Sequence, residues 1–325
     1  MKLVASLCGA LCSVLFAAGV AAQGFPSRPV TIVVPYPPGG LIDLVARTIQ
    51  NRYQAELGQP VVIENRSGAG GNVGQEYVAR AAPDGYTLLL ATNTHIVNQV
   101  VYSNLGFDFT TDFTPIAVVT SGPMVIAVNS AKVPAKDLRE FIAMLRSAPG
   151  KYSYASCNVG SPHHFSMEML KSIEHLDALH IPHKGCGPAV ADTVAGHIDT
   201  VVTTLPAAVP FFKEGRLRPI ALMSSTRSVA APQIPTVRES GIPELKDFSL
   251  DNYYGFMAPP GTPHAIAAKI EADALKIAEE PEVRKKLENS GMDMLVLNAT
   301  DMMKLIRADY AKYSAAAKAA NIRAE

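Results

Sequence analysis

Short apolar runs alternate with helix-length segments along most of this chain, and this alternation restricts the possible folds more than any other feature. The runs VTIVVPY, PVVIENR and YTLLLAT are almost continuously apolar, as in parallel strands that helices cover on both faces. The pattern therefore predicts an α/β fold with mostly parallel sheets flanked by helices. Helices are expected at residues 41–57, 73–82, 163–174, 187–195, 206–214, 263–279, 281–290 and 300–319.

The strand series is long enough for two sheets, and the regular alternation weakens after Ser224. Pro232, Pro235 and Pro243 break the next stretch into loops, and NYYGFMAPPG adds one late strand. We therefore expect the chain to cross between the two sheets twice, near residues 120 and 250, as in a two-lobed hinge protein. Lobe 1 would comprise residues 23–120 and 252–325, and lobe 2 residues 121–251.

The N-terminal residues 1–22 have the pattern of a secretory signal peptide. Lys2 precedes an apolar stretch over residues 3–18, and GVAA supplies small residues for cleavage after Ala22. A leucine precedes both Cys8 and Cys12, which disfavours lipidation. A membrane anchor is the alternative, but the stretch is barely long enough to span a bilayer. We expect a secreted, periplasmic protein.

Charge and cysteine content indicate which ligands are disfavoured and whether a disulfide is expected. Lys plus Arg and Asp plus Glu number 29 each, so no basic excess indicates nucleic-acid binding. Removal of the signal peptide leaves Cys157 and Cys186, each after a strand-like segment. In an oxidising compartment two remaining thiols pair more often than they stay free. A disulfide is therefore the favoured interpretation, and free thiols remain the alternative.

The segment PPGGLID follows the first strand and opens a helix. It lacks the lysine and hydroxyl of a phosphate-binding P-loop and the G-x-G-x-x-G spacing of a dinucleotide site. Its glycines allow close backbone approach, and the first amides of a helix attract an anion. An ordinary strand–helix turn is the alternative. The candidate binding residues here are Pro38, Gly39, Gly40, Leu41, Ile42 and Asp43, and Asp43 could also orient the turn.

Three further polar loops follow predicted strands, where parallel sheets place their ligands. Their convergence would be a stronger signal than any single loop. The candidates are Thr92, Asn93, Thr94 and His95 in the first, Ser156, Asn158, Ser161 and His163 in the second, and Thr203 and Thr204 in the third.

Signatures of catalysis are weak in this chain. No G-x-S-x-G elbow is present, and a disulfide would consume the thiol needed for a Cys157–histidine pair. His163, His164 and Glu168 share one predicted helix but have no convincing further metal ligand. We expect no enzyme activity, no cofactor and no metal.

With these residues identified, the chain resembles the Bug family, the periplasmic substrate-binding proteins of tripartite tricarboxylate transporters. The resemblance is carried by RPVTIVVPYPPGGLIDLVAR, LGQPVVIENRSGAGGNVGQEYVARAAPDGYTLLLAT, YSYASCNVGSPHH, HIPHKGCGPAVADTVAGHID, APQIPTVRESGIP and GFMAPPGTP. It implies a Venus-flytrap fold that closes on one small carboxylate. It also implies that the polar loops above hold this ligand, together with His183, Lys184 and Gly185.

Two departures from the family pattern concern the ligand's distal end. The family usually has tyrosine where His183 stands, and often an acidic or amide residue where Thr203 and Thr204 stand. Loss of an acidic group favours a distal end that is neutral, aromatic or a second carboxylate. Lys184 could pair with that carboxylate or be a solvated loop residue. Tyr253, Tyr254 and Phe165 could form pocket walls or core.

The resemblance implies a transport receptor that delivers its carboxylate to membrane transporter subunits. A sensor of the same fold that feeds a signalling system is the second hypothesis, and a secreted enzyme is the third. No sustained exposed heptads are present, so we expect a monomer.

Overall fold

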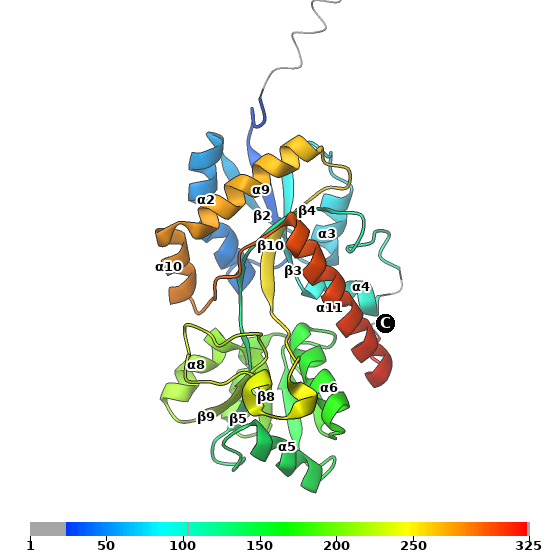
Figure 1. Cartoon of the computed structure of the whole chain (residues 1–325), viewed down its shortest axis with the longest axis vertical. Helices are drawn as coiled ribbons and strands as arrows, with labels where there is room; N and C mark the ends of the chain where they lie inside the picture. The colour runs from blue at the N-terminus through cyan, green and yellow to red at the C-terminus, as the bar shows by residue number, and fades with distance from the viewer. Residues whose placement is uncertain (1–23, 103, 324–325) are drawn as a thin grey trace, which may run out of the picture.

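The computed structural model describes residues 24–102 and 104–323, arranged as two lobes stacked along the long axis of the molecule (Figure 1). The expected signal peptide, with Cys8 and Cys12, lies outside the described residues. Within these residues no helix has the length and apolarity needed to cross a bilayer.

The first lobe is built on a six-stranded sheet with the strand order β11-β4-β10-β3-β1-β2. Its strands are β1 (Val30–Val34), β2 (Val61–Asn65), β3 (Thr87–Thr92), β4 (Thr114–Ser121), β10 (Tyr253–Ala258) and β11 (Leu297–Asn298). Its helices are α2 (Leu41–Leu57), η1 (Ala69–Gly71), α3 (Asn72–Ala79), α4 (Thr94–Val101), α9 (His264–Glu279), α10 (Pro281–Asn289) and α11 (Ala299–Ala320).

The second lobe is built on a five-stranded sheet with the order β7-β6-β8-β5-β9. Its strands are β5 (Met124–Asn129), β6 (Ser153–Ser156), β7 (Leu179–Pro182), β8 (Thr200–Thr204) and β9 (Leu217–Leu222). Its helices are α5 (Leu138–Ser147), α6 (Pro162–Glu174), α7 (Cys186–Val194), α8 (Leu205–Lys213), η2 (Val237–Ser240) and η3 (Pro243–Leu245).

Both sheets are mixed and flanked by helices, which confirms the α/β class and refines the expectation of mostly parallel sheets. β1 pairs in parallel with β2 and β3, and β6 with β7 and β8. β10 is antiparallel to β3 and β4, and β5 is antiparallel to β8 and β9. These two strands are the ones that follow each passage between the lobes. A strand entering a sheet from the cleft side must run against strands whose carboxyl ends point to the cleft.

Passage between the lobes occurs between Ser121 and Met124 and again through Asn252 into β10. Most predicted helices are present with ends shifted by a few residues, and α2 matches residues 41–57. Gly58 terminates α2 in the left-handed region at φ 64°, where glycine carries no steric penalty. The helix α4, with the sequence THIVNQVV, is not among the predicted helices, because it is short and begins with polar residues that are typical of a loop.

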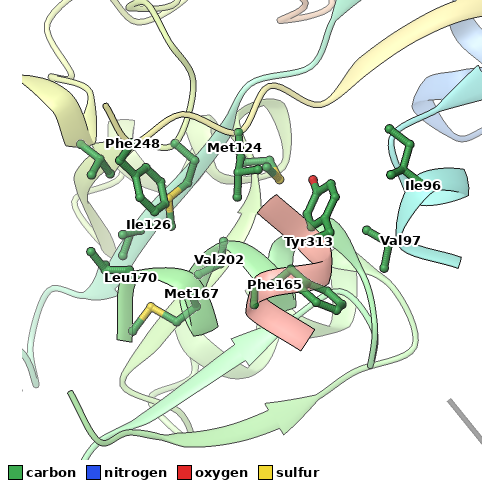
Figure 2. Close-up of a cluster of buried hydrophobic side chains, with 14 of the residues drawn as sticks. Ile96, Val97, Met124, Ile126, Phe165, Met167, Leu170, Val202, Phe248 and Tyr313 are labelled. Atoms are coloured by element: carbon green, nitrogen blue, oxygen red, sulfur yellow. The ribbon is translucent and has the colours of Figure 1, made fainter. Parts of the chain in front are cut away.

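A third connection between the lobes is the long C-terminal helix α11, which extends from the first lobe toward α6 of the second (Figure 1). Figure 2 shows Tyr313 of α11 among Ile96 and Val97 of α4 and Phe165 of α6. The Tyr313 and Phe165 rings meet edge to face, with centroids 5.5 Å apart. One continuous apolar cluster therefore joins the two lobes at this side of the molecule.

Candidate functional site

A cavity of about 730 Å³ lies between the lobes, at the ends of the strands that point toward each other. It is lined by loops from both sheets, as expected for an α/β ligand site. The predicted residues that line it are Pro38, Gly40, Leu41, Ile42, Thr92, Thr94, Asn158, Ser161, His163, Lys184, Gly185 and Thr204. The predicted residues that do not line it are Gly39, Asp43, Asn93, His95, Ser156, His183 and Thr203.

The first-lobe wall is the start of α2. Gly40 caps this helix and supplies no side-chain acceptor. Among the described residues, none accepts a hydrogen bond from the amides of Leu41 and Ile42. Helix N-termini carry partial positive charge, and both residues line the cavity. The α2 N-terminus therefore presents free donors to whatever occupies the cleft.

Asp43 acts from behind this turn. Its buried carboxylate accepts hydrogen bonds from the Gly39 amide at 3.0 Å, from Arg47 Nε at 2.8 Å and from Asn65 Nδ2 at 3.0 Å. Burial alone would raise the pKa of Asp43, but the bonds from Arg47, Gly39 and Asn65 outweigh burial and lower the pKa to about 2. Asp43 thus orients the Gly39–Gly40 turn and stays ionised without facing the cavity.

The first lobe also contributes the junction of β3 and α4 to the cavity wall. Thr92 Oγ1 accepts from the Thr94 amide at 3.0 Å, and the Thr92 amide donates to His95 Nδ1 at 3.2 Å. This bond leaves the proton of neutral His95 on Nε2, and burial lowers the pKa of His95 to about 3. Asn93 instead donates through Nδ2 to Tyr313 Oη at 3.0 Å. Thr92 and Thr94 therefore face the ligand space, while Asn93 and His95 hold the turn.

The second-lobe wall is the loop from β6 to α6. Ser161 Oγ caps α6 by accepting from the His164 amide at 3.3 Å, and Pro162 occupies the first turn. Ser156 is fully buried and bonds to His180 Nε2 at 2.7 Å. The donors of this loop are therefore largely occupied within the protein.

The predicted disulfide between Cys157 and Cys186 is confirmed, with Cα atoms 4.3 Å apart. The Gly185 amide also donates to the Cys157 carbonyl at 2.7 Å. The bridge joins the loops before α6 and α7, and both cysteines line the cavity. It therefore holds two second-lobe walls of the cleft in one arrangement.

His163 lines the cavity beside this bridge, with Nε2 3.9 Å from Cys186 Sγ. Burial lowers its pKa to about 4, so the ring is neutral at physiological pH. Donor atoms of Cys157, His163 and Cys186 lie within 4.8 Å of one another. The sulfurs are bonded to each other and carry no thiolate for a metal ion.

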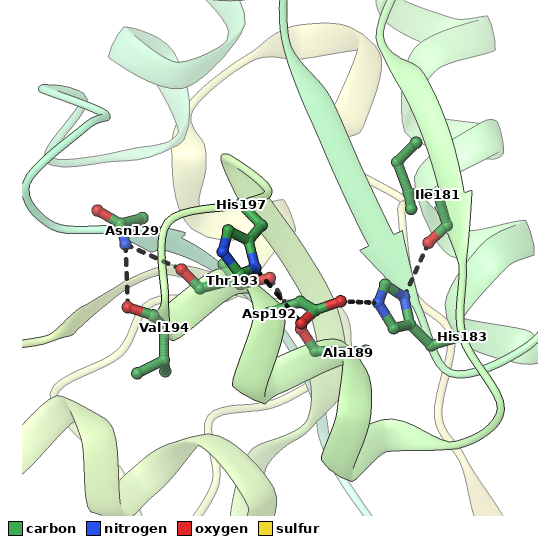
Figure 3. Close-up of polar contacts among 8 residues, drawn as sticks. All are labelled: Asn129, Ile181, His183, Ala189, Asp192, Thr193, Val194 and His197. Carbon is green, nitrogen blue, oxygen red and sulfur yellow. Dashed lines mark hydrogen bonds and ion pairs between the residues drawn. The ribbon is translucent and has the colours of Figure 1, made fainter.

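His183 does not line the cavity, and its ring faces Asp192 of α7 (Figure 3). Its Nε2 lies 2.8 Å from Asp192 Oδ2, and its Nδ1 lies 3.1 Å from the Ile181 carbonyl. Thr203 is fully buried, with Oγ1 3.9 Å from Cys157 Sγ. Of the departures from the family pattern, only Thr204 reaches the cavity lining.

Several lining residues were missed by sequence reasoning: Tyr36, Gly70, Asn98, Asn252 and Arg323. Of the three possible wall residues, Tyr254 lines the cavity, whereas Tyr253 and Phe165 are buried in the core. Tyr36 ends the first apolar run, so its position beside PPGG was an available signal. Asn98 lies on the unpredicted helix α4 and donates to the Gly70 carbonyl at 2.9 Å. Nothing in the sequence indicated that Arg323 lines the cavity, because it lies far in sequence from all of the strand-end loops.

The charge of the cavity wall is one-sided. Among residues 24–102 and 104–323, no aspartate or glutamate lines the cavity, whereas Lys184 and Arg323 do. Together with the free amides of α2, these two side chains make the cleft attractive to an anion.

Comparisons with known proteins agree with this geometry. The family model for the tripartite tricarboxylate transporter family receptor, TctC, matches residues 45–322. Protein BugT of Bordetella pertussis (strain Tohama I) is 36% identical over 248 residues, covering 76% of this chain and 75% of BugT.

Two solved structures from Rhodopseudomonas palustris share the fold. Rpa4515, described as a complex with adipate, superimposes with a TM-score of 0.78 at 31% identity, covering 92% of this chain and 99% of its own. MatC, described with bound malate, has a TM-score of 0.74 at 33% identity, covering 90% and 99%.

Proposed function

The chain belongs to the tripartite tricarboxylate transporter receptor family, and we propose that it captures a small carboxylate in its interlobe cleft for delivery to a membrane transporter. One observation carries this proposal: the uncapped N-terminus of α2 faces a cavity that has no acidic lining residue in the described part of the chain. The relatives described with adipate and malate support the same chemical class.

The proposed mechanism follows the two walls of the cleft. The ligand carboxylate docks on the amides of Leu41 and Ile42 and on the hydroxyls of Thr92 and Thr94. The second lobe then closes, and its other polar lining residues, Asn158, Lys184 and Thr204, complete the contacts. A ligand shifts this equilibrium only by its greater affinity for the closed form. The function therefore requires contacts from both lobes and no chemical step.

Secretion and assembly complete the proposal. The receptor acts in the periplasm after cleavage of the signal peptide near Ala22, works as a monomer and presents its closed form to the transporter subunits. In this proposal residues 23–120 and 252–325 form one moving unit and residues 121–251 form the other.

Thermal melting against a panel of small carboxylates tests this function. At a hundredfold excess over the dissociation constant, a ligand adds about 2.7 kcal/mol of stability, which raises the melting temperature by roughly 4–8 °C. Thr94→Val removes a cavity hydroxyl with little change in volume and should reduce the shift. Absence of a shift with every acid, for protein shown to carry no ligand after purification, would contradict carboxylate binding. Chemical change of the bound acid, followed by NMR, would contradict a purely receptive role.

A further inference from the structure

Arg323 lines the cleft near the end of the described chain, far in sequence from every lining residue except Ile322. It follows α11, the helix that packs against both lobes, and it lines the cavity together with Ile322. Lys184 reaches the same cavity from the loop that precedes α7. The ligand space is thus bordered by two cations from different parts of the fold.

The position of Arg323 is set by the end of α11. Asn321 adopts the left-handed region, at φ 50° and ψ 40°, and its amide donates to the Ala317 carbonyl. The Ile322 amide donates to the same carbonyl at 2.9 Å, and the Ile322 side chain packs against the core cluster shared by the lobes. This is a helix cap with its accompanying apolar contact, so the chain is turned in a defined direction just before Arg323.

The anchoring of α11 makes this placement depend on both lobes. Tyr313 accepts a hydrogen bond from Asn93 of the first lobe and packs on Phe165 of the second. Lys312 Nζ donates to the Ser249 carbonyl at 3.0 Å. The helix that carries Arg323 is therefore fixed at the interlobe side of the cleft, and it is not a loose tail.

We infer that Arg323 is a specificity-determining residue that recognises a second anionic group on the ligand. This inference rests on the proposed function. The first carboxylate occupies the amides of α2, which carry only partial charge. Lys184 and Arg323 are both exposed, so a monocarboxylate would leave their charges to the solvent, whereas a dicarboxylate could place its second group where Arg323 can bind it. A guanidinium suits this role, because its donors match a carboxylate in pairs.

The experiment compares ligands that differ only in the second charge. Isothermal titration would use straight-chain α,ω-dicarboxylates of four to eight carbons and the monoamide of each. For the wild type, the diacid should bind more tightly than its monoamide. In Arg323→Ala the diacid should lose about tenfold in affinity, or about 1.4 kcal/mol, while the monoamide stays within about twofold because it lacks the charge that the arginine recognises.

Arg307→Ala is the matched control, because Arg307 is exposed on the same helix and does not line the cavity. It changes the net charge equally and should leave both affinities nearly unchanged. Arg323→Lys should retain most of the preference for the diacid. Melting of each variant without ligand reports whether the fold is intact.

Three outcomes would overturn the inference. Arg323→Ala could weaken both ligands equally, it could act no more strongly than Arg307→Ala, or Lys184→Ala alone could abolish the preference. A wild type that binds diacid and monoamide equally well would also overturn it while leaving the proposed function standing. A wild type that binds none of these acids would instead refute the proposed function.

Discussion

The two strand–helix turns on opposite sides of the cleft both contain glycine, but they differ in whether the first amides of the helix remain available to a ligand. In the first lobe, the N-cap of α2 is Gly40, which has no side chain to occupy the helix amides. The Asp43 carboxylate accepts a hydrogen bond from the Gly39 amide on the side of the turn away from the cavity. In the second lobe, α6 starts at Ser161, whose hydroxyl occupies the His164 amide. The α2 turn keeps its first amides available, whereas in the α6 turn Pro162 removes one amide and Ser161 occupies another. A strand–helix turn is thus a binding element only where the protein leaves its helix amides unpaired.

The largest expected effect concerns the disulfide, which only the second-lobe turn has. Replacing Cys157 and Cys186 together by alanine should lower stability by about 2–4 kcal/mol, because the bridge closes a loop of about 30 residues. The melting temperature should fall by roughly 5–10 °C. Ligand affinity should fall less, since the bond between the Gly185 amide and the Cys157 carbonyl still joins the loops. Phosphine reduction of the wild type should give the same shift, and an unchanged melting temperature would refute this role.

Exchanging the chemistry of the two helix starts tests the comparison most directly. Leu41→Pro removes one free amide from α2, and proline is tolerated at the first helical position. Gly40, at ψ 173°, already has a conformation suited to the residue before proline. Because a hydrogen bond to a charged acceptor contributes about 1.5–3 kcal/mol, carboxylate affinity should fall roughly 10- to 100-fold, measured by calorimetry.

Two control variants accompany this exchange. Leu41→Ala removes the same side chain but keeps the amide, so it should bind nearly as well as the wild type. Pro162→Ala restores an amide at the start of α6 and should leave affinity unchanged. Equal losses in Leu41→Pro and Leu41→Ala would show that the side chain matters and the amide does not.

The approach of the lobes can be altered without touching either turn. A Cβ at Gly291 of the first lobe would lie 2.6 Å from Pro206 Cγ of the second, at φ 77°. Gly261 has φ 78° and open space around it. Alanine at either position should cost about 1 kcal/mol of stability for the backbone. Only Gly291→Ala should also hinder closure, lower affinity roughly three- to tenfold and enlarge the ligand-bound protein in small-angle scattering. Identical binding by the two variants would contradict an interlobe contact at Gly291.

The smallest effect at neutral pH concerns the titratable group on each turn. Burial lowers the pKa of His163 to about 4, below its unfolded value of 6.5. The unfolded chain therefore binds the proton more readily, and the contribution of neutral His163 to stability is lost as pH falls from 6.5 to 4. Asp43, with a pKa of about 2 against 3.8 unfolded, loses its contribution only below pH 3.8.

Melting curves at several pH values check this difference. His163→Gln should match the wild type at pH 7 and lose less stability than the wild type toward pH 4. Part of the acid slope should remain, because burial also lowers the pKa values of His95, His164 and His180. An unchanged slope in His163→Gln would show that His163 is not among the groups that sense acid.

Local patterns predicted much of this fold because they depend on neighbouring residues. The apolar runs located the strands, and Gly40 followed by an amphipathic segment located α2 to the residue. The helix α4 could not be predicted from local patterns, because it is short and its first residues are polar. Strand direction could not be predicted either. No local feature of VTIVVP or NYYGFMA indicates whether the chain enters its sheet from the cleft side.

The binding site, too, could be predicted only in part from the sequence. Loops at strand ends were identifiable, but the side of each loop that a residue faces was not. Asn93, His95 and His183 are polar residues in the expected segments, yet none of them lines the cavity. Their side chains instead contact Tyr313, the Thr92 amide and Asp192, respectively. Facing direction depends on partners such as Tyr313 and Asp192, which lie on other elements.

The sequence by itself determined the α/β class, the series of helices, the family and the turn that offers free amides, because these follow from periodicity, glycine positions and long matching motifs. Only the tertiary structure decided that the sheets are mixed, that Cys157 meets Cys186 across two loops, and that Arg323 joins Lys184 at the cleft. The physical reason is the distance over which each interaction acts. Backbone conformation is set by adjacent residues, whereas the cleft is formed by residues that meet only when two lobes and the helix between them have packed.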